Sequence, residues 1–224
     1  MKAIQEAARE SKAVIESGGK RTKPMVAKKL EALDARIRVC VACPLHKSRT
    51  LAVPGEGKSN ARVMIIGEAP GRSEDQTGRP FVGSSGKFLD QVMQGSGFDR
   101  ADFFITNICK CRPPANRTPK AGEIETCTSL YLFNQISLID PRLVVLLGGV
   151  AVRKLLGLKT VEQARGRIIE HEGRKFLATY HPAVRFYREE LAEKIKEDFA
   201  ILEVEMKKLS FAKEPKNERQ QDAQ

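Results

Sequence analysis

The cysteines of this chain have a spacing that is typical of metal ligands. Cys40 and Cys43 form a Cys-x-x-Cys pair followed by Pro44, and thiolates at this spacing can hold one metal centre. Cys111 and Cys127 supply a second pair further along the chain. Four thiolates suit either tetrahedral Zn²⁺ or an iron–sulfur cluster, and the spacing does not separate these alternatives. Buried free thiols are a third interpretation.

A fifth cysteine, Cys109, lies two residues before Cys111. In an extended segment both side chains point to the same face, so Cys109 could in principle replace Cys111 as a ligand. We expect instead that Cys109 is a buried free thiol.

A second group of side chains follows the ends of apolar runs that predict strands. Because the carboxyl ends of parallel strands meet at one edge of a sheet, we expect this group to form a ligand pocket. Each residue alone has a plain alternative as a core, turn or solvated residue, and the shared position favours binding. The group comprises Glu68, Ala69, Glu74, Phe81, Asn107 and His181.

The residue types in this group suit a planar heterocycle. The Asn107 amide offers one donor and one acceptor, which matches the edge of a base. Phe81 offers a stacking face, and His181 can stabilise an anion.

The elements that must position these residues alternate between strands and helices. This alternation predicts an α/β fold with a parallel sheet and helices on both faces. The strand-like runs lie at 63–66, 103–106, 143–147 and 176–180. The helix-like segments lie at 24–40, 85–94, 118–139, 150–156 and 186–209.

Local signals refine two of these elements. Thr118 and Pro119 predict a capped helix start, with Pro at the first helical position. The runs at 167–172 and 175–180 flank Gly173 and predict a hairpin at the sheet edge.

Composition limits the class of protein and the kind of partner. The 224 residues are enough for one sizeable core, and 41% of them are hydrophobic. A formal net charge of +11 favours a polyanionic partner such as nucleic acid, with a generally basic surface as the alternative. The apolar runs are too short to span a membrane, and the N-terminus lacks a signal-peptide core. We expect a cytoplasmic monomer.

The domain boundaries follow from polar termini. We expect one domain over residues 24–210, a flexible or helical arm over 1–23 and a disordered tail over 211–224.

Several motifs in register make the chain resemble the family 4 uracil-DNA glycosylases, which are iron–sulfur enzymes. The likeness runs from about Leu33 to Tyr187. The matching stretches are 40–45, 67–71 with Glu74 and Asp75, 78–83, 106–107, 110–114, 116–117, Cys127 and 181–182.

The resemblance implies a fold, a cofactor and a set of base contacts. The fold would be a three-layer α/β/α sandwich with a central four-stranded, mainly parallel sheet. A [4Fe–4S] cluster would bind Cys40, Cys43, Cys111 and Cys127, leaving out Cys109.

The same resemblance implies how uracil would be held. Asn107 would hydrogen-bond the uracil edge, and Phe81 would stack on the ring. Glu74 would lie beside C5 and exclude the methyl group of thymine, and His181 would lie near O2.

We expect a monofunctional enzyme that flips uracil out of double- or single-stranded DNA and hydrolyses its glycosidic bond. His181, Asn107 and loop amides would stabilise the departing uracil anion.

Better-known relatives place an Asp where this chain has Ala69, so Glu68 or backbone carbonyls would hold the attacking water. No lysine occupies the pocket motifs, which predicts no β-elimination. The basic loop of a relative that links covalently to DNA is also absent from the sequence, which predicts turnover.

The DNA backbone would be contacted by Arg112, Arg117 and Arg185. The gap left by the flipped base would be filled from the segment 184–186. Two alternatives stay open: a metal-stapled DNA-binding module without activity, and a glycosylase for another deaminated base such as hypoxanthine.

Overall fold

The computed structural model describes residues 22–211, so nearly all of the predicted arm and tail lies outside the described residues. At its centre is one five-stranded sheet with the order β2-β1-β3-β5-β4. The strands β1 and β2, β1 and β3, and β3 and β5 pair in parallel, whereas β4 is antiparallel to β5. The strands are β1 Val63–Gly67, β2 Phe103–Asn107, β3 Leu143–Leu147, β4 Ile168–His171 and β5 Arg174–Thr179.

The sheet has one strand more than the four that the family resemblance implied, so that expectation was wrong. The extra strand is β4, which forms the predicted hairpin with β5. Glu172 and Gly173 both have positive φ, at 48° and 73°, as a type I′ turn requires. This tight turn brings β4 back as an antiparallel edge strand.

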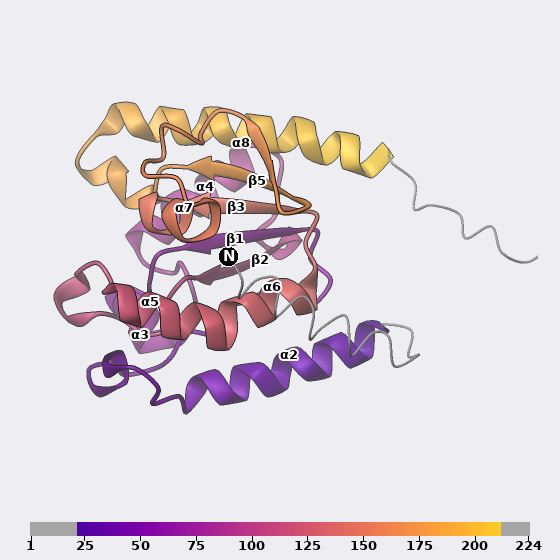
Figure 1. Cartoon of the computed structure of the whole chain (residues 1–224). Coiled ribbons are helices and arrows are strands. Elements are labelled where there is room, and N and C mark those ends of the chain that lie inside the picture. Colours follow the sequence, from indigo (N-terminus) through magenta and orange to yellow (C-terminus); the bar gives the residue numbers. More distant parts are fainter. Residues whose placement is uncertain (1–21, 212–224) are drawn as a thin grey trace, which may run out of the picture.

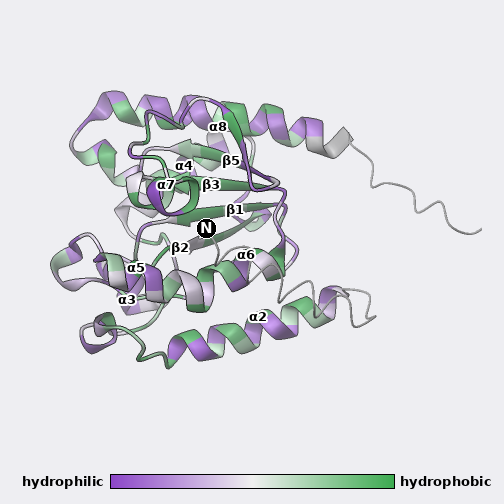
Figure 2. Ribbon diagram, viewed as in Figure 1, coloured by the Kyte–Doolittle hydropathy of each residue, from purple (hydrophilic) through white to green (hydrophobic). Residues whose placement is uncertain are grey.

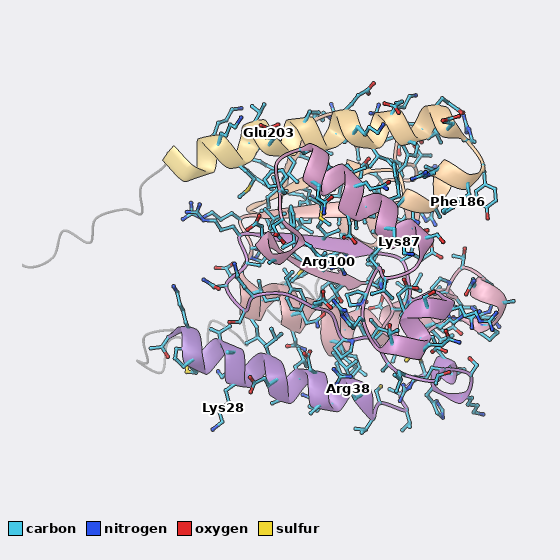
Figure 3. All side chains as sticks on the ribbon, turned by 180° about the vertical axis from the view of Figure 1, so that it is seen from behind. Lys28, Arg38, Lys87, Arg100, Phe186 and Glu203 are labelled. Carbon is cyan, nitrogen blue, oxygen red and sulfur yellow. The ribbon has the colours of Figure 1, made fainter. Side chains whose placement is uncertain are left out.

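Helices cover both faces of the sheet. Figures 1 and 3, which are opposite views, place α7 and α6 on one face and α4 on the other, with α8 along the β5 side. Figure 2 shows the apolar strands inside and helices of alternating hydropathy outside, as a sheet buried on both faces requires. The helices are α2 Lys23–Arg38, α3 Arg72–Thr77, α4 Ser84–Gly95, α5 Ala121–Cys127, α6 Phe133–Ile139, α7 Gly149–Leu156 and α8 Glu189–Phe211.

Two helices start three residues later than predicted, whereas the other predicted starts agree to within one residue. The helix α5 begins at Ala121 and not at Thr118, because the backbone stays extended through Lys120. The Glu123 carboxylate, and not a Thr118 cap, accepts the backbone N–H of Lys120 at 2.7 Å. A π-helical turn over Thr128–Leu132 then joins α5 to α6. The last helix begins at Glu189, after a short 3₁₀ turn at Pro182–Phe186 that the periodicity did not reveal.

The outer edge of β2 is covered by Gly55, Glu56 and Gly57. Glu56 and Ile105 exchange two backbone hydrogen bonds of 2.9 and 2.7 Å. Gly57 has φ of +136°, and a Cβ there would lie 2.2 Å from the Phe103 carbonyl oxygen. Only glycine permits this close approach. The covered edge cannot pair with another strand.

Among residues 22–211, no helix is long and apolar enough to cross a bilayer.

Candidate active site and cysteine cluster

A cavity of about 540 Å³ lies where β1, β2 and β5 end. The structure brings all six predicted pocket residues to its wall, although they come from the loop after β1, from α3, from the loop after α3, from the end of β2 and from the segment after β5. They are Glu68, Ala69, Glu74, Phe81, Asn107 and His181. Parallel pairing explains this convergence, because it places the carboxyl ends of the three strands side by side.

Asn107 ends β2 and is only 2% exposed, yet its side-chain Oδ1 has no hydrogen-bond partner. A buried acceptor without a partner costs about 1–3 kcal/mol. Gly67 makes room for this amide, because a Cβ at that position would lie 2.5 Å from Oδ1. The oxygen is therefore available to accept an N–H from a ligand in the cavity.

His181 is fixed in one tautomer by its own loop. The backbone N–H of Ala183 donates to Nδ1 at 3.2 Å, so Nδ1 is an acceptor and the neutral ring carries its proton on Nε2. Burial lowers the pKa of His181 to about 4, and the charge of Glu74 opposes this shift only in part. The imidazole is therefore a neutral donor at physiological pH.

Phe81 is buried with an unusual backbone φ of +50°. Its ring lies 5.9 Å from the His181 ring, measured between centroids. The absence of a side chain at Gly67 is again essential, because a Cβ there would lie 2.4 Å from Phe81 Cζ. The ring therefore forms an aromatic wall beside the Asn107 amide.

Glu74 organises the loops around the cavity. Its Oε1 accepts the backbone N–H groups of Val82 and Gly83 at 2.9 and 2.7 Å, and its Oε2 accepts that of Gly71 at 3.0 Å. Three backbone donors to one carboxylate hold the loops after β1 and α3 together. The sequence indicated the pocket position of Glu74 but not these backbone contacts.

Glu68 is a half-buried carboxyl group on the cavity wall. Burial raises its pKa, while the charge of Arg153 and a hydrogen bond from Thr118 oppose the rise. The neighbouring Ala69 contributes no ionisable group. Among the described residues, no lysine lines this cavity.

The three arginines predicted to contact DNA all have partners within the protein. Arg117 forms two hydrogen bonds of 2.9 and 2.7 Å with the carboxylate of buried Glu123. Arg112 donates to Asn116 Oδ1 at 2.7 Å. Arg185 lies over the Phe88 ring, with its guanidinium carbon 4.9 Å from the centroid.

Two exposed aromatic side chains stand at the mouth of the cavity. Phe186 and Tyr187 line it and are 52% and 85% exposed. Figure 3 labels Phe186 on the turn that precedes α8. The sequence singled out Phe186 but missed Tyr187, which lies one residue beyond the predicted segment.

The four cysteines predicted as ligands line a second, smaller cavity, and Cys109 does not. Cys109 is fully buried and hydrogen-bonds to Cys127, a contact that lowers the pKa of the Cys127 thiol. The ligand candidates come from the end of α2, the segment after β2 and the end of α5. They are Cys40, Cys43, Cys111 and Cys127.

The surroundings of these thiols suit an anionic metal–thiolate group. Arg49 Nη1 donates to Cys111 Sγ at 3.1 Å, and the backbone N–H of Lys110 donates to Cys127 Sγ at 3.2 Å. No acidic side chain among the described residues lines this cavity. Within the described chain, no three His, Cys, Asp or Glu side chains are grouped so that they could hold a metal ion.

Lys110 lies between the two cavities and was missed by the sequence analysis. Its buried ammonium group donates to Thr106 Oγ1 at 2.6 Å, to the Asn107 carbonyl at 2.8 Å and to Gln135 Oε1 at 2.7 Å. Burial lowers its pKa to about 8. Lys110 lines the cysteine cavity and not the larger one, and its hydrogen bonds anchor the end of the strand that carries Asn107.

The fold and the site together define a class of protein. An α/β sheet carries a cavity of about 540 Å³ with an amide, an aromatic ring and a neutral histidine at the carboxyl ends of its strands. The family model described as the uracil DNA glycosylase superfamily matches residues 54–202. This match covers more than half of the chain, so the chain belongs to this superfamily.

Individual relatives show to which family within this superfamily the chain belongs. The chain is 41% identical over 183 residues to a type-4 uracil-DNA glycosylase of Pyrobaculum aerophilum, covering 77% of this chain and 92% of the relative. It is 41% identical over 182 residues to that of Archaeoglobus fulgidus, covering 76% and 91%. A type-5 enzyme of Pyrobaculum aerophilum shares 35% over 149 residues, covering 58% and 65%. The chain belongs to the type-4 uracil-DNA glycosylases.

Proposed function

We propose that this protein removes uracil from DNA by hydrolysing its N-glycosidic bond, which starts base excision repair. The observation that supports this most directly is the unpartnered Oδ1 of Asn107 at the wall of the cavity. The N3–H of uracil would donate to this oxygen, and the amide nitrogen would donate to uracil O4. An amide in this position matches the edge of uracil in both donor and acceptor.

The remaining pocket residues have complementary roles in this proposal. Phe81 stacks on the uracil ring, and the Nε2–H of His181 donates to O2. Glu74 and Ala69 shape the side of the cavity, and we retain the prediction that Glu74 excludes the methyl group of thymine. The target base lies inside a duplex, so it must leave the stack before it reaches the cavity.

The bond between C1′ and uracil N1 breaks with both electrons going to uracil. The negative charge spreads onto O2, where the neutral His181 stabilises it by hydrogen bonding. The oxygen of a water molecule bonds to C1′, and its proton passes to Glu68 or to solvent. The half-buried Glu68 carboxylate would orient that water, since Ala69 has no group that could.

The absence of lysine from the cavity wall, among the described residues, supports hydrolysis without β-elimination. Phosphate contacts would come from Arg112, Arg117 and Arg185 around the cavity mouth. Arg117 already pairs with Glu123, so we expect Arg112 to be the stronger of those two phosphate ligands. The gap in the stack would be filled from residues 184–186.

We also propose that a [4Fe–4S] cluster binds the four cavity-lining cysteines, Cys40, Cys43, Cys111 and Cys127. The four thiols line one cavity, donors from Arg49 and the Lys110 backbone reach two of them, and the family resemblance favours an iron–sulfur cluster over a single Zn²⁺ ion. The cluster would join α2, the segment after β2 and α5 into one unit. Metal analysis and a visible spectrum of the purified protein test this assignment. Iron and sulfide in equal amounts with broad visible absorbance would support it, whereas stoichiometric zinc in a colourless protein would contradict it.

Alkali cleavage of a uracil-containing oligonucleotide tests the function. Substrates carry U·G, U·A or single-stranded uracil, and we expect an alkali-labile site at the uracil and no strand break before alkali. DNA binding without cleavage of any substrate would favour the inactive binding module. A matched oligonucleotide that carries hypoxanthine tests the other alternative. Release of hypoxanthine from it, identified by mass, with no uracil released from the first set would assign the other deaminated base.

A further inference from the structure

The aromatic wall of the cavity is held in a backbone conformation that phenylalanine rarely adopts. Phe81 has φ of +50°, in the left-handed region. Such a residue keeps its conformation only when its surroundings over-determine it. The groups that hold the Phe81 backbone therefore decide where its ring lies.

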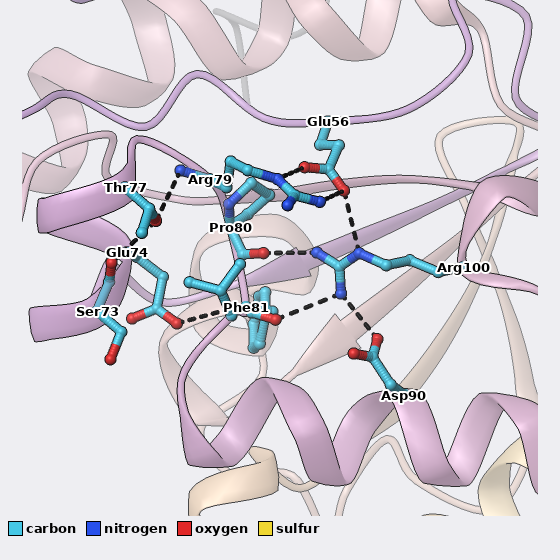
Figure 4. A network of polar contacts seen from close by, with 10 residues as sticks. Glu56, Ser73, Glu74, Thr77, Arg79, Pro80, Phe81, Asp90 and Arg100 are labelled. Atoms are coloured by element: carbon cyan, nitrogen blue, oxygen red, sulfur yellow. Dashed lines mark hydrogen bonds and ion pairs between the residues drawn. The ribbon is translucent and has the colours of Figure 1, made fainter.

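Arg100 supplies such a restraint from outside the cavity. Its Nη2 donates to the Pro80 carbonyl at 2.5 Å, and its Nη1 donates to the Phe81 carbonyl at 3.3 Å. Figure 4 shows one guanidinium facing both carbonyls. Arg100 does not line the cavity, so it reaches the proposed substrate only through Phe81.

Two acidic residues fix the orientation of this guanidinium. Asp90 on α4 accepts from Nη1 at 2.8 Å, and Glu56 accepts from Nε at 3.1 Å. Glu56 is itself paired by two backbone hydrogen bonds with Ile105 of β2, the strand that ends in Asn107. The network therefore links the aromatic wall to the strand that carries the base-reading amide.

Close packing holds the other side of the same segment. A Cβ at Gly86 would lie 1.9 Å from the Phe81 carbonyl oxygen, so the first turn of α4 presses against this peptide. The Phe81 carbonyl lies between α4 and Arg100 and has little freedom to rotate.

We propose that Arg100 is a positioning residue for uracil excision, which acts by fixing the Phe81 backbone and hence its ring. This inference rests on the stacking role proposed for Phe81. Arginine is needed because its planar guanidinium reaches two carbonyls and two carboxylates at once, which the single ammonium of lysine cannot do.

The test is the single-turnover rate of uracil release from a U·G duplex by the full chain. We expect Arg100→Ala to lower this rate at least tenfold, and Arg100→Lys to lower it by a similar factor. The inhibition constant for free uracil should rise in both variants. Arg79→Ala is the matched control, because Arg79 pairs with the same Glu56 but contacts neither carbonyl, and it should stay within twofold of wild type.

A double-mutant cycle separates positioning from general destabilisation. If Arg100 acts through the Phe81 ring, Arg100→Ala should lower the rate less than threefold in a Phe81→Ala background. Full additivity of the two losses, or a wild-type rate in Arg100→Ala, would overturn the proposal. Arg100→Lys serves the same cycle if the alanine variant does not fold. A wild-type protein that releases no uracil would instead defeat the proposed function itself.

Discussion

Asn107 combines two properties that a purely structural asparagine does not have. It is almost fully buried, and its amide oxygen lacks a partner in a core where buried polar atoms are nearly always paired. In the proposed function, a ligand N–H at this position would recover the free energy lost to this arrangement. Asn107 would then link stability and recognition at one atom.

We expect Asn107→Ala to lower the single-turnover rate at least 100-fold, or about 2.7 kcal/mol, as loss of a preorganised transition-state hydrogen bond does. The melting temperature should not fall, because the substitution removes an unpartnered buried oxygen. Asn134→Ala on α6, which loses only a surface hydrogen bond to Leu130, is the control. A variant that melts earlier yet cleaves normally would assign Asn107 to the core instead.

His181 predicts a particular pH dependence. Its pKa is about 4 in the folded protein, so the neutral donor form persists through mildly acidic conditions. We expect the single-turnover rate to show no loss from this residue between about pH 8 and pH 5. A fall centred near the ordinary histidine value of about 6.5 would contradict the neutral-donor role.

The same shift affects stability with a defined sign. Between pH 6.5 and 4 the unfolded chain binds a proton at His181 that the folded chain does not. Above about pH 6.5 the ring is neutral in both states, so its titration does not reduce the free energy of unfolding. As the pH falls from 6.5 toward 4, proton binding by the unfolded chain lowers the free energy of unfolding progressively. Denaturant unfolding of wild type and His181→Gln over this range measures the difference.

At the scale of elements, glycines allow the close approaches that form the site. Gly67 admits the Asn107 amide and the Phe81 ring, while Gly57 lets the preceding segment cover the edge of β2. A hydropathy pattern does not reveal such contacts, because they depend on which backbones meet in three dimensions. Helix starts were less predictable for the same reason. At the start of α5, the Glu123 carboxylate accepts the backbone N–H of Lys120 and also binds Arg117.

We expect Gly57→Ala to destabilise the fold by about 1–3 kcal/mol, through positive-φ strain and a clash with the Phe103 carbonyl. Gly95→Ala, in α4 with open space around the new methyl group, should instead stabilise by about 0.5–1 kcal/mol. Denaturant midpoints measure both. Equal effects of the two substitutions on the denaturant midpoint would show that covering the β2 edge contributes nothing to the stability of the fold.

At the scale of the whole molecule, the net charge of +11 dominates long-range interaction with DNA. Arg117 on the cavity wall is paired with Glu123, so we expect affinity for the backbone to depend on the other cations near the cavity and on the general field.

We expect the affinity for uracil-free DNA to fall with salt, with a log–log slope of about −3 if three phosphates are contacted. Arg112→Ala should make the slope shallower by about 1. Lys28→Ala, an exposed site on α2, should leave it unchanged. Fluorescence anisotropy at several salt concentrations measures the slopes of wild type and both variants. If Arg112→Ala has the same slope as wild type, Arg112 does not contact a DNA phosphate.

The sequence by itself determined the alternating architecture, the edge hairpin, the six pocket residues and the two cysteine pairs, because strand periodicity and strand-end loops are local signals. The tertiary structure decided the start of α5 at Ala121, the unpartnered state of the Asn107 oxygen and the histidine tautomer. It also decided the Arg100 network, whose partners lie up to 44 positions away in the chain. Hydrogen-bond partners and close contacts depend on segments distant in sequence, and only the assembled fold brings them together.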